Sequence, residues 1–225
     1  MMTINRSALV AGATGLVGQE LVRQLLAGGS CGKVIALVRR ELAIEHPSLV
    51  QLRVDYERLE ESAAGIDMKE ADVYCALGTT IRTAGSQAAF RKVDYDYPLE
   101  LGRLAKRQGA GQLLVVSSMG ADARSRIFYS RVKGELEEAL RGLGLPTLSL
   151  FRPSLLLGER AEFRLGERVG AVLSRGLSFA MAGPLARYKP IHARDVAAGM
   201  IAAARKAQPG CTVYLSDAIA ELARR

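Results

Sequence analysis

The chain is poor in the residues that build disulfide frameworks and transition-metal sites. Its 225 residues include only three cysteines and two histidines, and no C-x-x-C pair. The cysteines, Cys31, Cys75 and Cys211, are odd in number, widely spaced, and in or near apolar runs. We therefore expect free buried thiols in a reducing cytoplasm, with neither a disulfide frame nor a metal site.

Long apolar runs are also missing. No apolar stretch reaches the roughly 18 residues of a membrane-spanning helix. Residues 1–6 lack the charged, apolar and cleavage regions of a signal peptide. These absences predict a cytoplasmic protein without a membrane span.

Aromatic side chains and runs of like charge are scarce as well. Aromatics make up 5% of the chain and no five like charges are consecutive, although the net charge is +8. RNA-binding modules place aromatic side chains in recognisable motifs, and none is present here. Because the arginines are scattered singly along predicted helices, we expect no nucleic-acid partner. An anionic cofactor or substrate accounts equally well for part of the positive charge.

What the sequence does contain is a regular alternation of short apolar runs and longer helical patterns. Residues 113–116 are all apolar, as in a strand covered by helices on both faces. The alternation predicts an α/β fold, namely a Rossmann-type, doubly wound parallel β-sheet with helices on both faces. With 49% hydrophobic residues and no long linker, residues 1–225 are expected to form a single domain. The expected strands are 7–13, 33–38, 49–54, 72–77, 112–117, 147–151 and 211–215, and the expected helices are 15–27, 86–108, 127–141 and 194–206.

The most informative stretch is the glycine-rich turn at residues 12–18, which joins the first strand to the first helix. Such a turn leaves helical N–H groups unpaired at the positive end of the helix dipole, where a pyrophosphate binds well. Its spacing is G-x-x-G-x-x-G, not the G-x-G-x-x-G of ordinary dinucleotide dehydrogenases. Similar turns also occur without ligands. Whether this turn binds a nucleotide is therefore judged from the residues that follow the later strands.

In a doubly wound sheet the ligand lies at the carboxyl ends of the strands. Arg39 and Arg40 follow the second strand, where an NAD site usually has an acidic residue, and their donor forks match a 2′-phosphate. An ordinary basic turn is the alternative. Asp55 after the third strand either accepts from the adenine amino group or caps the next turn. Gly78 after the fourth either admits the cofactor closely or forms a tight turn. We expect NADP(H) to be preferred over NAD(H).

After the fifth strand, Tyr129 and Lys133 are four residues apart and so face the same side of the expected helix. A Y-x-x-x-K pair is weak evidence by itself. Its position just beyond the fifth strand, where a catalytic site would lie, strengthens it.

Together these residues resemble the short-chain dehydrogenase/reductases in their extended and atypical branches. The glycine turn matches the cofactor fingerprint, and Ser118, Tyr129 and Lys133 match the Ser-Tyr-Lys triad. Residues 151–154 and 190–197 resemble segments of sugar-nucleotide epimerases. A narrower similarity is to the Tat-interacting-protein-like oxidoreductases. It is carried by residues 37–40, 77–80, 93–97, 117–122 and 132–135.

The resemblance implies an NADP(H)-dependent oxidoreductase acting on a carbonyl or secondary alcohol. Tyr129 would be the general acid, and Lys133 would lower its pKa and hold the nicotinamide ribose. Ser118, in preference to Ser117, would orient the substrate oxygen. The partners implied are a small-molecule substrate and a second copy, bound through helices 86–108 and 127–141. The expected cofactor contacts are Gly12, Thr14, Gly15, Leu16, Val17, Gly18, Arg39, Arg40, Asp55, Leu77, Gly78, Tyr129, Lys133, Pro153, Leu156 and Arg164.

Two alternatives stay open at this point. One is a non-catalytic NADP(H)-binding regulatory or redox-sensing protein, and the other is a sugar-nucleotide-epimerase-like enzyme. The Tyr129–Lys133 pair favours an enzyme, because a sensor need not retain it. The sequence also departs from the extended members in three ways. Ser118 and Tyr129 are only eleven residues apart, which is shorter than in many relatives. About residues 152–225 supply only a reduced C-terminal substrate-side region, and the family's additional Asn is not identifiable.

Overall fold

The computed structural model describes residues 6–29, 31–158 and 187–224. Their strands are β1 (Ser7–Ala11), β2 (Lys33–Val38), β3 (Leu49–Arg53), β4 (Asp72–Cys75), β5 (Gln112–Val116), β6 (Thr147–Arg152), β7 (Leu156–Leu157), β8 (Ile191–His192) and β9 (Gly210–Leu215). Their helices are α1 (Leu16–Gly28), η1 (Tyr56–Arg58), α2 (Leu59–Ser62), α3 (Ile81–Ala84), α4 (Gln87–Arg91), η2 (Lys92–Asp96), α5 (Tyr97–Arg107), α6 (Phe128–Gly142), α9 (Ala193–Lys206) and α10 (Ser216–Leu222).

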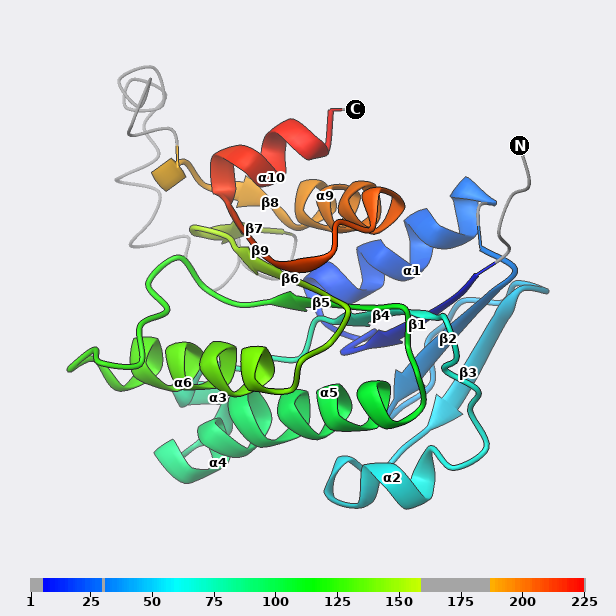
Figure 1. Cartoon of the computed structure of the whole chain (residues 1–225), viewed down its shortest axis with the longest axis horizontal. Helices are drawn as coiled ribbons and strands as arrows, with labels where there is room; N and C mark the ends of the chain where they lie inside the picture. The colour runs from blue at the N-terminus through cyan, green and yellow to red at the C-terminus, as the bar shows by residue number, and fades with distance from the viewer. Residues whose placement is uncertain (1–5, 30, 159–186, 225) are drawn as a thin grey trace.

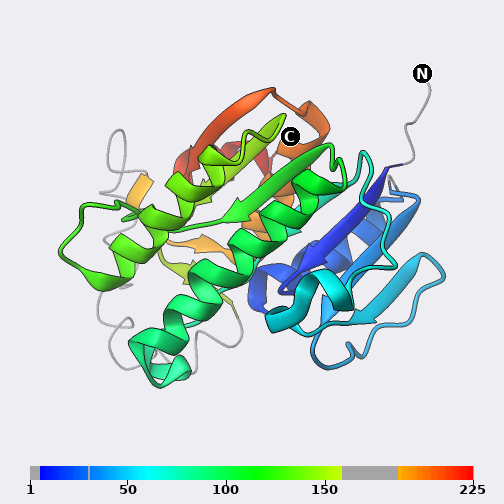
Figure 2. The ribbon, with the colours of Figure 1, turned by 60° about the horizontal axis from the view of Figure 1, so that its bottom comes forward.

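The strands form a parallel sheet of seven, in the order β3-β2-β1-β4-β5-β6-β9, and a small second sheet of β7 and β8. Helices α1, α9 and α10 cover one face of the large sheet, and α5 and α6 cover the other (Figure 1). Figure 2 shows α5 and α6 lying side by side across their face. The doubly wound parallel sheet predicted from the sequence is confirmed.

Alternate residues of each inner strand enter two separate hydrophobic cores. Leu9 of β1 packs in the core that includes Leu104 of α5, whereas Val10 packs in the core that includes Leu21 of α1. Both faces of these strands are therefore dry, which explains why the strands read as continuous apolar runs.

The predicted element boundaries differ from the structure mainly next to glycines and at one long helix. Strand β1 ends at Ala11 because Gly12 adopts a φ of +81°, which an extended strand does not allow. The helix predicted over 86–108 is divided into α4, a π-helical turn η2 and α5. The short elements α2, α3, α10, β7 and β8 were not predicted, because two to seven residues give little periodic signal.

The cysteines differ in burial, which partly corrects the expectation of three buried thiols. Cys75 is buried in β4, Cys31 is half-buried and Cys211 is exposed on the outer strand β9; none of the three forms a disulfide within the described part of the chain. Burial raises the pKa of the Cys75 thiol to about 11, so this thiol is neutral at physiological pH.

The order of strands reverses between β1 and β4. From β1 the chain moves outward through β2 and β3, and then returns to β4 on the other side of β1. Directly beyond the strands, the Ala76 N–H donates to the carbonyl oxygen of Ala11 at 2.9 Å. In open α/β sheets a ligand site lies at such a switch point, outside the carboxyl ends of the strands.

Candidate functional site

The glycine turn brings the start of α1 against the end of β4. A Cβ on Gly12 would lie 2.5 Å from the carbonyl carbon of Ala76, and one on Gly18 would lie 2.0 Å from the carbonyl oxygen of Gly12. Neither position has space for a side chain. The first and third glycines of the turn are therefore required by close backbone approach.

The first turn of α1 has no side-chain cap. Its N-cap, Gly15, supplies no side-chain acceptor, and the turn contains no acidic residue. The positive end of the helix is thus open to an anion. Together with the missing Cβ atoms of Gly12 and Gly18, this geometry fits a dinucleotide pyrophosphate.

A cavity lies at this switch point, beyond the ends of β1, β2 and β4. Its wall contains six residues predicted from the sequence, which confirms that the fold brings them together, and five that were not predicted. The predicted residues are Gly12, Thr14, Gly15, Arg39, Leu77 and Gly78, and the others are Leu37, Tyr56, Ala76, Val93 and Tyr97.

Two tyrosines form much of the unpredicted wall. The rings of Tyr56 and Tyr97 stack with their centroids 5.4 Å apart, and the Tyr56 hydroxyl donates to the carbonyl oxygen of Leu37 at 3.3 Å. Burial raises the pKa of Tyr56, so its hydroxyl remains a donor. The available signals were weak: Tyr56 directly follows Asp55, and Tyr97 ends the run 93–97 that carries the family resemblance.

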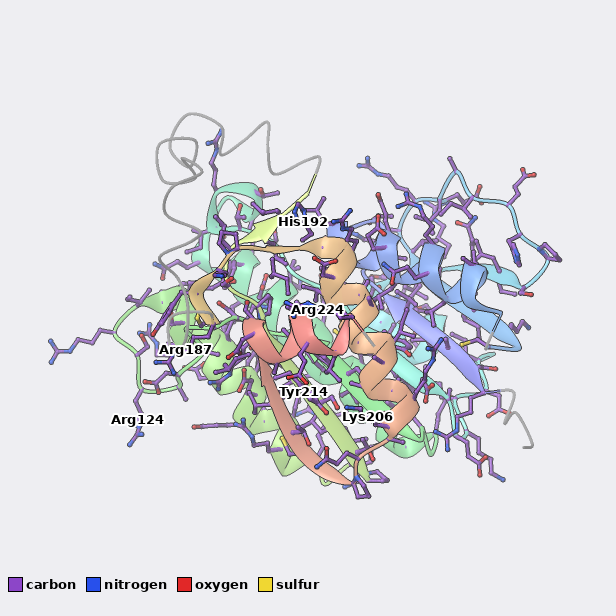
Figure 3. The ribbon with its side chains drawn as sticks, turned by 90° about the horizontal axis from the view of Figure 1, so that it is seen from above. Arg124, Arg187, His192, Lys206, Tyr214 and Arg224 are labelled. Atoms are coloured by element: carbon purple, nitrogen blue, oxygen red, sulfur yellow. The ribbon has the colours of Figure 1, made fainter. Side chains whose placement is uncertain are left out.

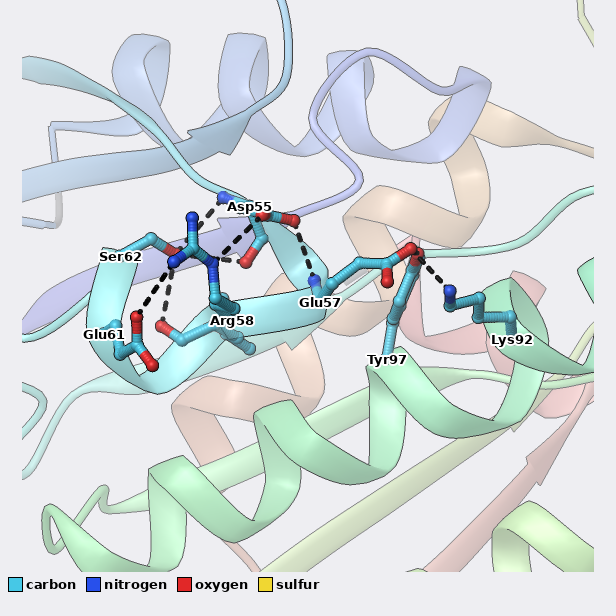
Figure 4. A network of polar contacts seen from close by, with 8 residues as sticks. Asp55, Glu57, Arg58, Glu61, Ser62, Lys92 and Tyr97 are labelled. Carbon is cyan, nitrogen blue, oxygen red and sulfur yellow. Dashed lines mark hydrogen bonds and ion pairs between the residues drawn. The ribbon is translucent and has the colours of Figure 1, made fainter.

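At the end of β2 the structure separates the two predicted arginines. Both are exposed, but the cavity wall includes Arg39 and not Arg40. Asp55 has a local role, because its Oδ1 accepts from the Glu57 N–H at 2.9 Å and its Oδ2 lies 3.7 Å from Arg58 Nε (Figure 4). The capping alternative for Asp55 is the one found, and Asp55 is not in the cavity wall.

Three predicted residues of α1 face other parts of the protein. Val17 is buried in the core beneath the helix, and Gly18 packs on the glycine turn. Leu16 is half-buried, and a Cβ added to Gly158 would touch its side chain at 3.1 Å. Any contact that these residues make with a cofactor would come from their backbone, and it stays a prediction.

The predicted contacts after β6 lie outside this cavity wall. Pro153 is buried, and its carbonyl oxygen accepts from the Met119 N–H at 3.1 Å. Leu156 begins the short strand β7, which pairs with β8. Arg164 lies outside the described residues. The cofactor roles of all three stay predictions.

Tyr129 and Lys133 lie on α6, and neither is among the residues of the cavity wall. Tyr129 is half-buried, with its ring 5.5 Å from that of Phe90. Lys133 Nζ is buried and lies 2.7 Å from Asp94 Oδ1. A Cβ on Gly78, a residue of the cavity wall, would lie 3.8 Å from this Nζ. The ammonium group is thus placed directly behind the cavity wall.

Asp94 is a further functional candidate that was not predicted from the sequence. It lies in the π-helical turn η2, its side chain is 1% exposed, and its Oδ2 accepts from the Thr79 N–H at 2.8 Å. Burial by itself lowers the pKa of Lys133, but the attraction of Asp94 and Tyr129 outweighs burial and raises it. Lys133 is therefore a stable cation at neutral pH.

A second buried carboxylate distinguishes the two serines after β5. The Ser117 hydroxyl donates to Glu137 Oε1 at 2.6 Å, and Arg152 donates to the same carboxylate at 2.9 and 2.6 Å. Ser117 is thus committed to a buried structural network. This leaves Ser118, which is half-buried at the strand end, as the predicted triad serine.

The loop between Ser118 and Tyr129 is packed tightly on α6. A Cβ on Gly134 would lie 2.1 Å from the backbone nitrogen of Ala123, and the Asp122 N–H donates to the carbonyl oxygen of Ser130 at 3.0 Å. The path from the serine to the tyrosine is therefore fixed by helix α6 itself.

Comparison with known proteins places this geometry in a family. A family model described as NAD(P)H-binding matches residues 12–157, more than half of the chain. The chain belongs to this NAD(P)H-binding family. The match contains the glycine turn, Arg39, Tyr129 and Lys133, and the resemblance to atypical short-chain dehydrogenase/reductases is confirmed.

Relatives of this NAD(P)H-binding protein occur in animals and fungi. Protein HTATIP2 of Rattus norvegicus is 39% identical over 166 residues, which cover 72% of this chain and 68% of that protein. The FMP52 protein of Chaetomium globosum is 32% identical over 226 residues, covering 97% of each chain.

Solved structures show the same fold. An oxidoreductase of the short-chain dehydrogenase/reductase family from Burkholderia thailandensis has a TM-score of 0.68 at 20% identity, covering 96% of this chain and 93% of that one. A superfamily protein from Agrobacterium tumefaciens, solved with bound NAD, has a TM-score of 0.69 at 16% identity, covering 93% of this chain and 77% of that one. At these identities the likeness concerns the fold alone.

The relatives correct the expected location. The expectation of a cytoplasmic protein is contradicted, because the FMP52 relatives of Chaetomium globosum and Candida albicans are named as mitochondrial. The absence of a secretory signal does not distinguish the cytoplasm from an organelle.

The described residues contain neither a membrane-spanning helix nor a metal-binding cluster. No helix among them is long and apolar enough to span a bilayer, and no group of three or more His, Cys, Asp or Glu residues is arranged to hold a metal ion.

Proposed function

We propose that the protein is an NADP(H)-dependent oxidoreductase that reduces a carbonyl or oxidises a secondary alcohol. The observation that supports this is the meeting of two features at one cavity. The uncapped helix start behind Gly12 and Gly15 lies at one side, and Lys133 of the Tyr129–Lys133 pair stands behind Gly78 at the other. A cofactor bound along this wall would end beside the catalytic pair.

In this proposal the residues of the chain divide into holding and proton-transfer roles. The backbone around Gly12 and the first turn of α1 would bind the pyrophosphate, and Lys133 would hold the nicotinamide ribose. When bound, the cofactor supplies a hydride to the carbonyl carbon. Tyr129 would donate its hydroxyl proton to the carbonyl oxygen, and Ser118 would orient that oxygen.

In this proposal Lys133 acts on the Tyr129 oxygen through its charge. A cation beside a phenol favours the phenolate that remains after proton transfer. Asp94 keeps this cation in place at 2.7 Å within a buried site. We assign the 2′-phosphate of NADP(H) to Arg39, because this guanidinium belongs to the cavity wall and can bind a phosphate with two donors.

Replacing the tyrosine hydroxyl tests the enzyme. Tyr129→Phe should bind NADPH as the unmodified protein does, but its kcat for carbonyl reduction should fall by about 10²–10⁴-fold, the contribution of general acid catalysis. The matched control is Tyr214→Phe, on the outer strand β9, which should keep full activity. Cofactor binding and turnover are measured by NADPH fluorescence and absorbance.

The outcomes separate the three candidate functions. Unchanged turnover in Tyr129→Phe would remove this residue from the mechanism. NADPH binding with no turnover of any carbonyl, alcohol or sugar nucleotide would favour a regulatory protein. Conversion of a sugar nucleotide without net consumption of NADPH would favour an epimerase.

A further inference from the structure

Large apolar side chains are exposed mainly around the ends of the central strands. Ile81 is 39% exposed after β4, and Ile127 is 67% exposed after β5. Leu155 is 36% exposed after β6, and Tyr188, shortly before β8, is 47% exposed. The other two such residues in the described part of the chain lie on the outer strands β3 and β9. Four of the six exposed large apolar side chains in the described part of the chain thus lie beyond the carboxyl ends of the central strands.

The described parts of the same connections contain more basic than acidic residues. Residues 76–86, 117–127, 153–158 and 187–190 contain five basic residues and one acidic residue, Asp122. Nearby cations in the strands and helices are neutralised, as when Arg152 pairs with Glu137. The five basic residues have no such carboxylate partner among the described residues. They are Arg82, Arg124, Arg126, Arg187 and Lys189.

Hydrogen bonds join three of these connections, namely residues 117–127, 153–158 and 187–190. The Met119 N–H, in the loop after β5, donates to the carbonyl oxygen of Pro153 at 3.1 Å, in the turn after β6. The Ile191 N–H donates to the carbonyl oxygen of Leu155 at 3.0 Å. The Ser154 hydroxyl donates to the carbonyl oxygen of Lys189. Figure 3 shows Arg124 and Arg187 on the same side of the molecule. We call the surface made by these three connections the substrate rim.

We infer that the substrate is a carbonyl compound with an apolar body and an anionic group such as a carboxylate. The inference rests on the proposed function, because it concerns what approaches Tyr129. Ile127, Leu155 and Tyr188 provide apolar contact for the body. The guanidinium groups of Arg124 and Arg187 provide charge-assisted hydrogen bonds for the anion.

Binding of matched probes tests this without turnover. The full chain is titrated with 4-carboxybenzaldehyde, with its neutral methyl ester, and with 4-oxobutanoate, which has the charge but no aromatic body; NADP⁺ is present to prevent reduction. The carboxylate with the aromatic ring should bind about tenfold more tightly than either of the others. Raising the salt concentration should reduce its advantage over the ester, because ions screen exposed charges.

Paired charge removals locate the effect. Arg124→Ala with Arg187→Ala should abolish the preference for the carboxylate over the ester while leaving binding of the ester unchanged. The control is Arg205→Ala with Lys206→Ala, at the end of α9. This helix end lies near the amino ends of the strands, away from the substrate rim, because the Ala204 carbonyl oxygen accepts from the side chain of Gln112 at the start of β5. The control should keep the full preference.

Each result decides a separate question. Equal binding of the carboxylate and its ester would overturn the inference, whether or not either is reduced. Displacement of the carboxylate by UDP-glucose, with tighter binding of UDP-glucose, would also overturn it. A clear preference for the carboxylate, with no NADPH consumed by either aldehyde or by a broad panel of other carbonyls, would uphold the ligand class and refute the proposed reductase.

Discussion

Among single residues, Lys133 depends most strongly on one partner. Its side chain is 4% exposed, and Asp94 provides the carboxylate that compensates its charge. Removing one member of a buried ion pair leaves an uncompensated charge in the interior. This lowers the free energy of unfolding more than replacing both members by apolar residues does. Loss of Asp94 should therefore lower stability as well as disturb the proposed chemistry.

Asp94→Asn should lower the free energy of unfolding by about 3 kcal/mol near neutral pH. In the unmodified protein the pKa of Lys133 is raised, so the ion pair's contribution is complete below the ordinary value of 10.5 and is lost as pH rises through the raised value. In the variant Lys133 is still buried but has lost the attraction of the Asp94 carboxylate, so its pKa falls. The variant then gains stability as the pH approaches 10.5, and its deficit shrinks.

Urea unfolding near pH 7 and near pH 10 measures this difference. The control is Asp96→Asn, an exposed residue of the same turn, which should change little at either pH. A deficit for Asp94→Asn that is the same at both pH values would show that Lys133 is not the group responsible.

The sequence pointed to the residues whose role follows from their type, and it missed those whose role follows from their orientation. The glycine turn and Arg39 were predicted because a strand end fixes where they lie. Asp94 was within a recognised motif, but a carboxylate in a helical pattern is usually on the solvated face. Its inward direction comes from the π-helical turn, which a helical period does not reveal.

At the scale of elements, α6 organises the candidate site. Tyr129, Lys133, Gly134 and Glu137 all belong to it, and each contacts a different segment. Through Glu137 it fixes the ends of β5 and β6, and through Gly134 it fixes the loop between them. The spacing from serine to tyrosine is therefore a property of this helix and its contacts.

Gly134→Ala should destabilise the protein by about 1–3 kcal/mol, because the new methyl group overlaps the backbone of Ala123 and the loop must move. It should also lower kcat more than it weakens NADPH binding, because the loop carries the path from Ser118 to Tyr129. The control in the same helix is Gly142→Ala, where a Cβ meets nothing within 4 Å.

Chemical unfolding and steady-state kinetics compare the two alanine variants. Gly142→Ala should be neutral or stabilising by up to about 1 kcal/mol, from helix propensity alone. If the two variants had the same stability and the same kcat, the tight contact between the loop and α6 would be unimportant.

At the scale of the whole molecule, cofactor binding should raise the melting temperature. A ligand that binds only the folded state stabilises by about 2.7 kcal/mol at a concentration of 100 Kd, which corresponds to roughly 5–10 °C for a protein of this size. At equal concentrations NADPH should produce a larger shift than NADH, because Arg39 lies at the cavity wall.

Arg39→Ala should make the two shifts equal, whereas Arg40→Ala, outside the cavity wall, should keep the difference. Thermal unfolding with each cofactor provides the measurement. Equal shifts in the unmodified protein would refute the assignment of the 2′-phosphate to Arg39.

The π-helical turn η2 allows the helices on either side of it, α4 and α5, to pack against different parts of the protein. A π turn holds one residue more than an α turn, so the helix after it is rotated by about 100° relative to the helix before it. Before the turn, Phe90 of α4 meets the rings of Phe128 and Tyr129, whereas after it Leu101 of α5 packs into the core of the sheet. Deleting a single residue from η2 would bring the two helices back into phase and turn Asp94 away from Lys133. Because of this one extra residue, α5 can pack into the core of the sheet while α4 and Asp94 face helix α6.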